Sequence, residues 1–506
     1  MGKQLLSIPS FTAGEMSDSM QGRTDFAKYF SAASRIENFV VLPHGPITRR
    51  PGTYFVSEVK TSSAKTRLIP FSFSTEQTYV LEFGNQYIRF YKDDGQITSG
   101  GSAYEISSPY TTAQLFDLKF AQSADVMYIC NENHPVKKLS RTGHTSWTLA
   151  DVDFTDGPYL DSNTSSTEVT PSGTSGSITI TANSSIFVST DVDRFINFSN
   201  GYAKITAFSS GTSVSANVIN NFDNTTAVTD WKLGAFSTTT GFPRCVSFFE
   251  QRLVFAGTSN QPQTMFFSKS GDYENMTSGT NDDDAMIYTI ASNQVNAIQA
   301  LKATRTLIVM TTGGEYAVSS GASQDAITPT NINIRKQSNY GSSGVDALSI
   351  GNATIFLQRA KRKIRELAYN FDTDGYTAPD LTILADHISE SGLTDMSYQQ
   401  EPYSVVWAVR ADGQMAGLTY NRLENVVAWH RHIFGGKSDT GKTVKQQKIS
   451  FTANSTNVNT TSNQITITGH GLATGDQVYY YAASNKIGGL SNSKVYYVIA
   501  VDANNI

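Results

Sequence analysis

The chain lacks what a disulfide framework, a zinc site or a membrane span requires. Its 506 residues include only two cysteines, Cys130 and Cys245, and both lie in apolar, strand-like runs, so we expect buried free thiols. No apolar run reaches the length of about 18 residues that a membrane-spanning helix needs. The N-terminus also lacks the long apolar core of a secretory signal peptide, which predicts synthesis in a cytoplasm.

Charge is scarce as well. Charged residues make up 16% of the chain, and 39 basic against 44 acidic residues give a net charge of −5. A protein that coats nucleic acid should be clearly basic, so this balance argues against that class. The polar surface is expected to consist of Ser, Thr, Asn and Gly side chains, as in many β-rich structural proteins.

Aromatic-rich hairpins recur along the chain, each with an apolar strand, a polar turn and a second apolar strand. Starts within each contiguous run are roughly 50 residues apart, the period expected of propeller blades. One blade cannot bury its own apolar face, so stacked blades must share a core. The sequence therefore predicts an all-β, propeller-like body. The six hairpins start at Thr78, Val126, Arg252, Thr306, Thr354 and Ser404.

Local patterns support this interpretation. In the first hairpin, Tyr79, Leu81 and Phe83 fall on one face by period-two alternation, and residues 84–85 suit a two-residue turn. Helical periodicity is rare, and the best candidate for a helix is residues 24–39.

A change in composition interrupts the repeat. Ser, Thr, Asn and Gly dominate from residue 161 to 240, yet strand alternation continues, which favours an inserted β domain over a disordered linker. The predicted order is an N-terminal anchor segment (1–60), the first blades (61–160), the inserted domain (161–240), the remaining blades (241–433), a linker (434–463) and a C-terminal β module (464–506).

Residues 436–443 match the phosphate-binding loop pattern G-x-x-x-x-G-K-[ST]. Such a loop needs a helix N-terminus behind it to bind phosphate. Here a strand-like stretch follows, and no apolar strand ending in Asp lies downstream to hold magnesium. We therefore expect Lys442 to be inert.

Two groups of side chains are candidate metal ligands. His430 and His432 would share one face of a strand, but no third ligand with suitable spacing is evident, so a core or surface role is favoured. Asp282, Asp283 and Asp284 lack the alternating spacing of a calcium loop, which favours a solvated loop.

Arg359, Lys361, Lys363 and Arg365 alternate as a basic stripe on a predicted strand. The stripe could contact nucleic acid or an acidic partner, or could protect an edge strand from aggregation. No G-x-S-x-G nucleophile elbow occurs. A pair of carboxylates for sugar hydrolysis stays open, because such residues need not be close in the chain. We expect no cofactor and no enzymatic activity.

Residues 11–53 resemble the opening of the tail nozzle proteins of short-tailed bacteriophages, also called tail tubular protein B or stabilisation protein. The matching pieces include Gly14-Glu15, Gly22-Arg23 with Asp25, and the run from Arg49 to Thr53. Later stretches resemble the same family, in order, up to about Trp429. These stretches are RLIPFSFSTEQTYVLEFGNQYIRFY, QSADVMYIC, DGPY, GFPRCVSFFEQRLVFAGT, GDYENM, GGEYAV, NYGSSG and RADGQMAGLTY. The final 43 residues, 464–506, are similar to the FCCH-like β module of phage tail proteins.

This resemblance implies a structural virion protein of the phage tail, made in the host cytoplasm. Proteins of the family form a homohexameric ring that meets the tail adaptor ring, helps to hold tail fibres and encloses the channel for genomic DNA. Mild acidity fits a channel through which DNA passes without sequence-specific binding, because phosphate contacts would add affinity. The alternatives are a glycan-binding or glycan-degrading propeller acting on the host surface, and a cellular scaffold propeller. The chain ends in a turn after which a further strand is expected, so we expect an incomplete C-terminal module.

Residues 11–53 also hold the candidate interface, which consists of Arg23, Asp25, Arg49 and Arg50. Arginine can pair bidentately with carboxylates, which suits contacts between subunits. The segment could pack on its own body or reach a neighbouring ring. The alternative, that Arg49 and Arg50 only cap the first strand at the surface, stays open.

Overall fold

The chain is built from β-strands. The computed structural model describes residues 8–292, 294–321, 325–372, 374–434, 436–437, 443–444, 449–472, 474, 477–482, 486–491 and 495–506. Within these residues, the helices are 3-10 turns of three to five residues, and all other regular elements are strands. The prediction of an all-β protein is confirmed.

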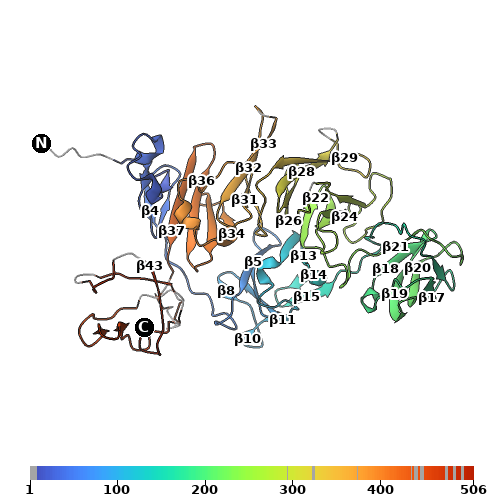
Figure 1. Cartoon of the computed structure of the whole chain (residues 1–506), viewed down its shortest axis with the longest axis horizontal. Coiled ribbons are helices and arrows are strands. Elements are labelled where there is room, and N and C mark those ends of the chain that lie inside the picture. Colours follow the sequence, from blue (N-terminus) through green and yellow to red (C-terminus); the bar gives the residue numbers. More distant parts are fainter. Residues whose placement is uncertain are drawn as a thin grey trace.

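Six antiparallel sheets follow one another as propeller blades (Figure 1). The first contains β5 (Arg67–Ser72), β6 (Thr78–Gly84), β7 (Tyr87–Lys92) and β11 (Glu105–Ser107), with β8 (Gly95–Gln96) paired to β7. The second contains β12 (Lys119–Ser123), β13 (Val126–Asn131), β14 (His134–Gly143) and β15 (Ser146–Asp151). The third contains β22 (Cys245–Phe249), β23 (Arg252–Ala256), β24 (Thr264–Phe267) and β25 (Met286–Thr289).

The remaining three sheets repeat this meander. The fourth contains β26 (Ile298–Ala303), β27 (Leu307–Thr311), β28 (Gly314–Ser320) and β29 (Ile332–Ser338). The fifth contains β30 (Leu348–Ile350), β31 (Ala353–Leu357), β32 (Ile364–Asn370) and β33 (Gly375–Thr377). The sixth contains β34 (Leu393–Gln399), β35 (Val405–Arg410), β36 (Met415–Asn421) and β37 (Val426–His432). The six predicted hairpins are the two middle strands of these six sheets.

Consecutive sheets share apolar cores, as stacked blades must. In the first two sheets, Phe71, Leu81 and Phe83 pack with Ile129 and Leu139, and all five side chains are fully buried. Comparable clusters join each later sheet to the next, up to the sixth. Burying one such side chain stabilises the fold by about 1.5–3 kcal/mol. The predicted inward face of Tyr79, Leu81 and Phe83 is thus confirmed.

The junction between the sixth and first sheets is different. Among the described residues, no apolar cluster contains side chains of both sheets. Instead, Leu68 and Val80 of the first sheet are 60% and 42% exposed, and Val409 of the sixth is 43% exposed. An ion pair between Arg67 and Asp395 joins the two sheets here. The six blades therefore have one polar seam.

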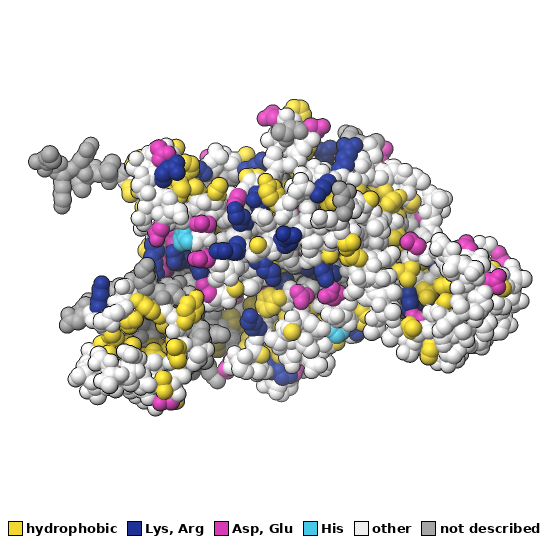
Figure 2. Space-filling model, in the orientation of Figure 1, with side chains coloured by type: hydrophobic (Ala, Val, Ile, Leu, Met, Phe, Trp, Pro, Cys, Tyr) yellow, Lys and Arg dark blue, Asp and Glu magenta, His cyan; other side chains and the backbone are white. Residues whose placement is uncertain are grey.

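A separate six-stranded sheet interrupts the body between the second and third blades, as a lobe at the right of Figure 1. It has its own buried core, which includes Ile180, Phe198 and Val214. Few charged side chains appear on this lobe in Figure 2. The sheet lies within the region predicted as an inserted β domain, while the domain boundaries themselves stay predictions. Its strands are β16 (Val169–Pro171), β17 (Ser177–Ala182), β18 (Phe195–Phe198), β19 (Gly201–Ser210), β20 (Ser213–Asn220) and β21 (Trp231–Leu233).

The N-terminal segment, residues 11–53, packs on the last blade. The strand β1 (Gly14–Glu15) lies between β2 (Ala32–Ala33) and β37, and β3 (Phe39–Val41) pairs with β4 (Ile47–Arg49). The helix predicted over residues 24–39 is wrong. Only a 3-10 turn, Ala27–Ser31, forms there, because the residues after it extend as strands against the blade.

Two smaller features complete the description. The first hairpin turns at Asn85 and Gln86, one residue later than predicted, since Gly84 still pairs with Tyr87. The described part of the C-terminal region contains short pairs of strands. They are β38 (Gly436–Lys437) with β39 (Thr443–Val444), β40 (Val458–Asn459) with β41 (Gln464–Ile465), and β42 (Gln477–Tyr479) with β43 (Val495–Tyr497).

Candidate functional site

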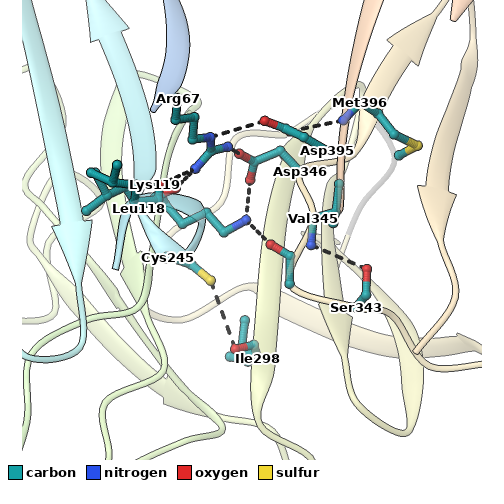
Figure 3. A network of polar contacts seen from close by, with 12 residues as sticks. Arg67, Leu118, Lys119, Cys245, Ile298, Ser343, Val345, Asp346, Asp395 and Met396 are labelled. Atoms are coloured by element: carbon teal, nitrogen blue, oxygen red, sulfur yellow. Dashed lines mark hydrogen bonds and ion pairs between the residues drawn. The ribbon is translucent and has the colours of Figure 1, made fainter. Parts of the chain in front are cut away.

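A cluster of charged side chains lies where the first strands of the blades converge (Figure 3). Arg67, on β5, is only 5% exposed. Its guanidinium Nε lies 3.2 Å from Asp395 on β34, and its Nη2 lies 3.4 Å from Asp346, just before β30. Nη1 donates to the carbonyl oxygens of Leu115 and Leu118, at 3.1 and 2.8 Å. A single arginine therefore links the first, fifth and sixth blades.

Lys119, on β12, extends the cluster to the second blade. Its Nζ lies 2.5 Å from Asp346 and also donates to the carbonyl oxygen of Gly344. Asp346 thus receives two cations, Arg67 and Lys119. Removing one partner of such a buried pair would leave a charge without compensation, at a cost of about 3–5 kcal/mol.

A cavity of about 350 Å³ lies beside this cluster. Its wall consists of residues from β12, β22 and β26 and the residues around the start of β30. The charged side chains in the wall are Lys119, Lys302 and Asp346. Asp346 is surrounded by protein, yet 42% of its side chain is exposed. We attribute this exposure to the cavity that it lines.

Burial and charge act against each other in this wall. Burial raises the pKa of Asp346, but the attraction of Lys119 and Arg67 outweighs it, so the pKa is lowered overall. Burial lowers the pKa of Lys302, which Asp346 only partly opposes. Cys245, in the same wall, has a pKa raised to about 12 by burial. Because the thiolate is the reactive form, this thiol is a poor nucleophile.

Both cysteines are buried free thiols, as predicted. The charged side chains at the axis of the body, where the first strands of the blades converge, were not predicted. A signal was present, since Arg67, Lys119 and Lys302 are the only charged residues of the strands RLIPFS, KFAQS and IQALKA. A charge in the innermost strand of a repeat points toward the axis that the strands share.

A second polar cluster holds the N-terminal segment on the last blade. The carboxylate of Glu15 is fully buried. It accepts hydrogen bonds from the Ile36 amide at 2.8 Å and from both Nε and Nη2 of Arg431, and lies 2.8 Å from Nε2 of His387. The preceding Gly14 has φ of +70°, and a Cβ there would lie 2.3 Å from the Trp429 nitrogen. Only glycine tolerates this approach.

The predicted interface residues are not brought into one cluster. Arg23 pairs with Asp25 at 2.8 Å, and both side chains are more than half exposed. Arg49 is exposed on β4. Arg50 lies 4.2 Å from the ring centre of Phe434, directly after the last blade. Arg50 therefore contacts its own body, whereas the other three residues face solvent in the single chain, and their interface role stays a prediction.

Several stretches that carry the phage resemblance contact one another. Glu315 of GGEYAV is buried and accepts a hydrogen bond at 2.8 Å from Ser342 of NYGSSG. Tyr128 of QSADVMYIC donates at 2.9 Å to Glu274 of GDYENM. Asp156 of DGPY accepts at 3.0 Å from the amide of Met276, also in GDYENM. These stretches therefore make hydrogen bonds within single blades and between neighbouring parts of the body.

One prediction from charge patterns is wrong, and a second is confirmed only in part. Residues 358–363 connect β31 to β32, so no basic stripe runs along one strand. Arg365 is instead buried beneath Tyr340, at 3.5 Å from the ring centre. Residues 282–284 lie in a loop, as predicted, and Asp282 and Asp283 are exposed, but the third residue is not. Asp284 is 6% exposed, and the carbonyl oxygens of all three residues accept from the buried Arg252.

The remaining candidates are the histidine pair and the phosphate-loop match. His430 and His432 are buried in the last blade. Nδ1 of His430 lies 2.6 Å from Nε2 of His432. The described residues contain no group of three or more His, Cys, Asp and Glu side chains placed to hold a metal ion, and no described helix is long and apolar enough to cross a membrane. Lys442, in the phosphate-loop match, lies outside the described residues. The flanking pairs Gly436–Lys437 and Thr443–Val444 form a two-stranded ladder.

Comparisons with known proteins give similarity of fold only. No family model and no curated protein matches the chain. Among solved structures, the Neurospora crassa Pan2 WD40 domain is 8% identical with a TM-score of 0.30, covering 64% of this chain and 82% of its own. The β-propeller domain of Myceliophteria thermophila Cps50 (Swd1) is 8% identical with a TM-score of 0.32, covering 71% and 100%. A putative 6-phosphogluconolactonase from Bacteroides uniformis is 12% identical with a TM-score of 0.32, covering 71% and 91%. At these values, the propeller assignment depends on the sheet order and shared cores described above.

Proposed function

We propose that this chain is a structural component of a short bacteriophage tail, namely a subunit of the nozzle ring that forms the distal conduit for DNA ejection and supports tail fibres. The observation that carries the proposal is the ordered series of nozzle-like stretches between Gly14 and Trp429. Their polar residues, among them the buried Glu15 and Glu315 and the half-buried Glu274, make specific contacts within and between the blades. Such contacts suit a part that transmits force and holds its shape.

The N-terminal segment supports an assembly role. Glu15 fixes the segment to the last blade, so the rest of the segment is held in a defined place. Arg23 and Asp25 are exposed there, and Phe30 is 52% exposed. A closed ring needs two different complementary patches on each subunit. We assign one of them to this exposed part of the segment.

The charge balance supports passage of DNA without specific binding. The net charge is −5, and each Lys or Arg that pairs with a phosphate would add affinity through counterion release. A homohexamer of this chain would carry about six times this negative charge. The conduit is therefore expected to be neutral to acidic and to release DNA readily.

Electron microscopy of the purified protein, alone and with its tail partners, tests the proposal. We expect a sixfold ring at the distal end of the tail. Replacing Arg23, Asp25 and Phe30 by Ala should weaken ring formation without unfolding the body, because none of them is buried. The matched control replaces the exposed Lys65 and Glu76 by Ala. A monomeric chain inside intact virions, or a monomer that binds host glycans, would refute the ring.

A further inference from the structure

The axial cavity contains a lysine that the surrounding carboxylates do not neutralise. Lys302 lies on β26 in the cavity wall. Among the residues that the structure describes, its ammonium group forms no hydrogen bond and no ion pair, while its backbone pairs with Ile308 in the sheet. Lys119, in the same wall, is held by Asp346 and by the carbonyl oxygen of Gly344. Lys302 is therefore the cation of this wall with free donors, and an ammonium group has three of them.

Counting the charges at the axis leads to the same residue. Arg67, Lys119 and Lys302 contribute three positive charges, and Asp346 and Asp395 contribute two negative ones. Both carboxylates already pair with Arg67 or Lys119. One positive charge remains, and it lies on Lys302. Lys302 is half-buried, and a charge that is partly withdrawn from water is costly to keep unless a group of opposite sign joins it.

The cavity has room for such a group. Its volume of about 350 Å³ corresponds to roughly ten water molecules at ~30 Å³ each. Asp346, in the same wall, is 42% exposed, so solvent reaches the cavity. The apolar side chains of Phe120, Phe248 and Leu301 complete the wall. The site therefore combines a free cation, a solvent path and walls that reduce the screening of charge.

We propose that the axial cavity binds one small oxyanion, an inorganic phosphate or a small carboxylate, with Lys302 as its charged ligand. Asp346 stays paired with Arg67 and Lys119, so it does not occupy the free donors of Lys302. The site does not depend on the proposed role in a phage tail, because every group in it belongs to a single chain. The two proposals are therefore tested independently: a chain that forms no ring can still bind an anion, and a chain that forms the ring can fail to bind one.

Isothermal titration of the full chain with inorganic phosphate, and in parallel with acetate, tests this site. Ionic strength is held constant with sodium chloride, so that general screening is not measured. We expect saturable binding of one anion per chain. A hydrogen bond between charged groups contributes about 1.5–3 kcal/mol, so Lys302→Met should weaken binding by about 10- to 150-fold.

Two variants keep the test sharp. Lys302→Arg retains the charge and should retain binding, and Lys65→Met removes an exposed lysine elsewhere and should bind as the wild type does. Thermal melting of each variant verifies that it is folded. Failure of the wild type to bind either anion would overturn the proposal. Equal binding by wild type and a folded Lys302→Met variant would also overturn it.

Discussion

The buried carboxylate of Glu15 gives the most specific prediction. Glu15→Gln keeps the size of the side chain but removes the charge that pairs with Arg431. One acceptor oxygen is also replaced by a donor, which faces the guanidinium. Breaking a buried ion pair costs about 3–5 kcal/mol. Since Arg431 and His387 are 15% and 28% exposed, we expect the lower end, about 3 kcal/mol.

This free energy should appear as local opening of the N-terminal segment, because the blades have cores of their own. A change of about 3 kcal/mol corresponds to a roughly 150-fold increase in the opened fraction. Amide hydrogen exchange reports it at Ser17, which donates to the carbonyl oxygen of Leu384 at 2.8 Å, and at Asn38, which donates to that of Arg431 at 2.9 Å, because both bonds join the segment to the body. Amides within the blades should keep their exchange rates.

Asp25→Asn is the matched control, because it removes one carboxylate of an exposed ion pair in the same segment. Water screens this exposed pair, so exchange should change far less than in Glu15→Gln. The effect of Glu15 should also depend on pH. Burial raises the pKa of Glu15, but hydrogen bonds from His387 and Arg431 outweigh it and lower the pKa overall. The stabilisation is therefore present above the ordinary carboxyl pKa and is lost as pH falls through the lowered value. Unchanged exchange at Ser17 and Asn38 in Glu15→Gln would refute this account.

Three further predictions concern buried groups of the body. Arg67→Met should lower the free energy of unfolding by about 3 kcal/mol in denaturant titrations, because two carboxylates lose their shared cation. The lower end of the range for buried pairs applies, since Asp346 and Asp395 are 42% and 23% exposed. A loss below about 1 kcal/mol would contradict the polar seam. Burial raises the pKa of Cys130 and Cys245, so neither thiol should react with a thiol reagent until the protein unfolds, and rapid native labelling would contradict this. Burial lowers the pKa of His430, and that of His432 to about 4. The unfolded chain therefore binds more protons below the ordinary histidine pKa of about 6.5, and stability should fall as pH drops from there toward about 4. Replacing both His430 and His432 by Gln should reduce this dependence of stability on pH in thermal melts. An unchanged dependence would show that other groups cause it.

The repeat made the body predictable. Alternation in TYVLEF identified the face that Tyr79, Leu81 and Phe83 bury, because burial on one face is what sets period two in a strand. Turns were less certain. The first hairpin turns one residue late, and the expected basic stripe is a connection in which Lys361 takes φ of +60°. Turn geometry depends on single backbone angles, which an apolar pattern does not encode.

The axial cluster could not be predicted from local patterns. Arg67 and Asp395 are 328 residues apart, and each looks like an ordinary charged residue at the end of its stretch. Only the closure of the blades brings them within 3.2 Å. The same holds for Glu15, whose partner His387 lies 372 residues away. Looking for charged residues in the innermost strand of each repeat would have identified Lys119 and Lys302.

The docking of the N-terminal segment on the last blade has a consequence for biosynthesis. Glu15 leaves the ribosome early, but Arg431 follows 416 residues later. At about 5–20 residues per second, this interval lasts roughly 20 to 80 seconds. During that time five blades can fold on one another, while Gly14 and Glu15 have no strand to join. The first part of the chain to be made is thus among the last to reach its native position. A chain released before Arg431 would keep the segment undocked even if its earlier blades were native.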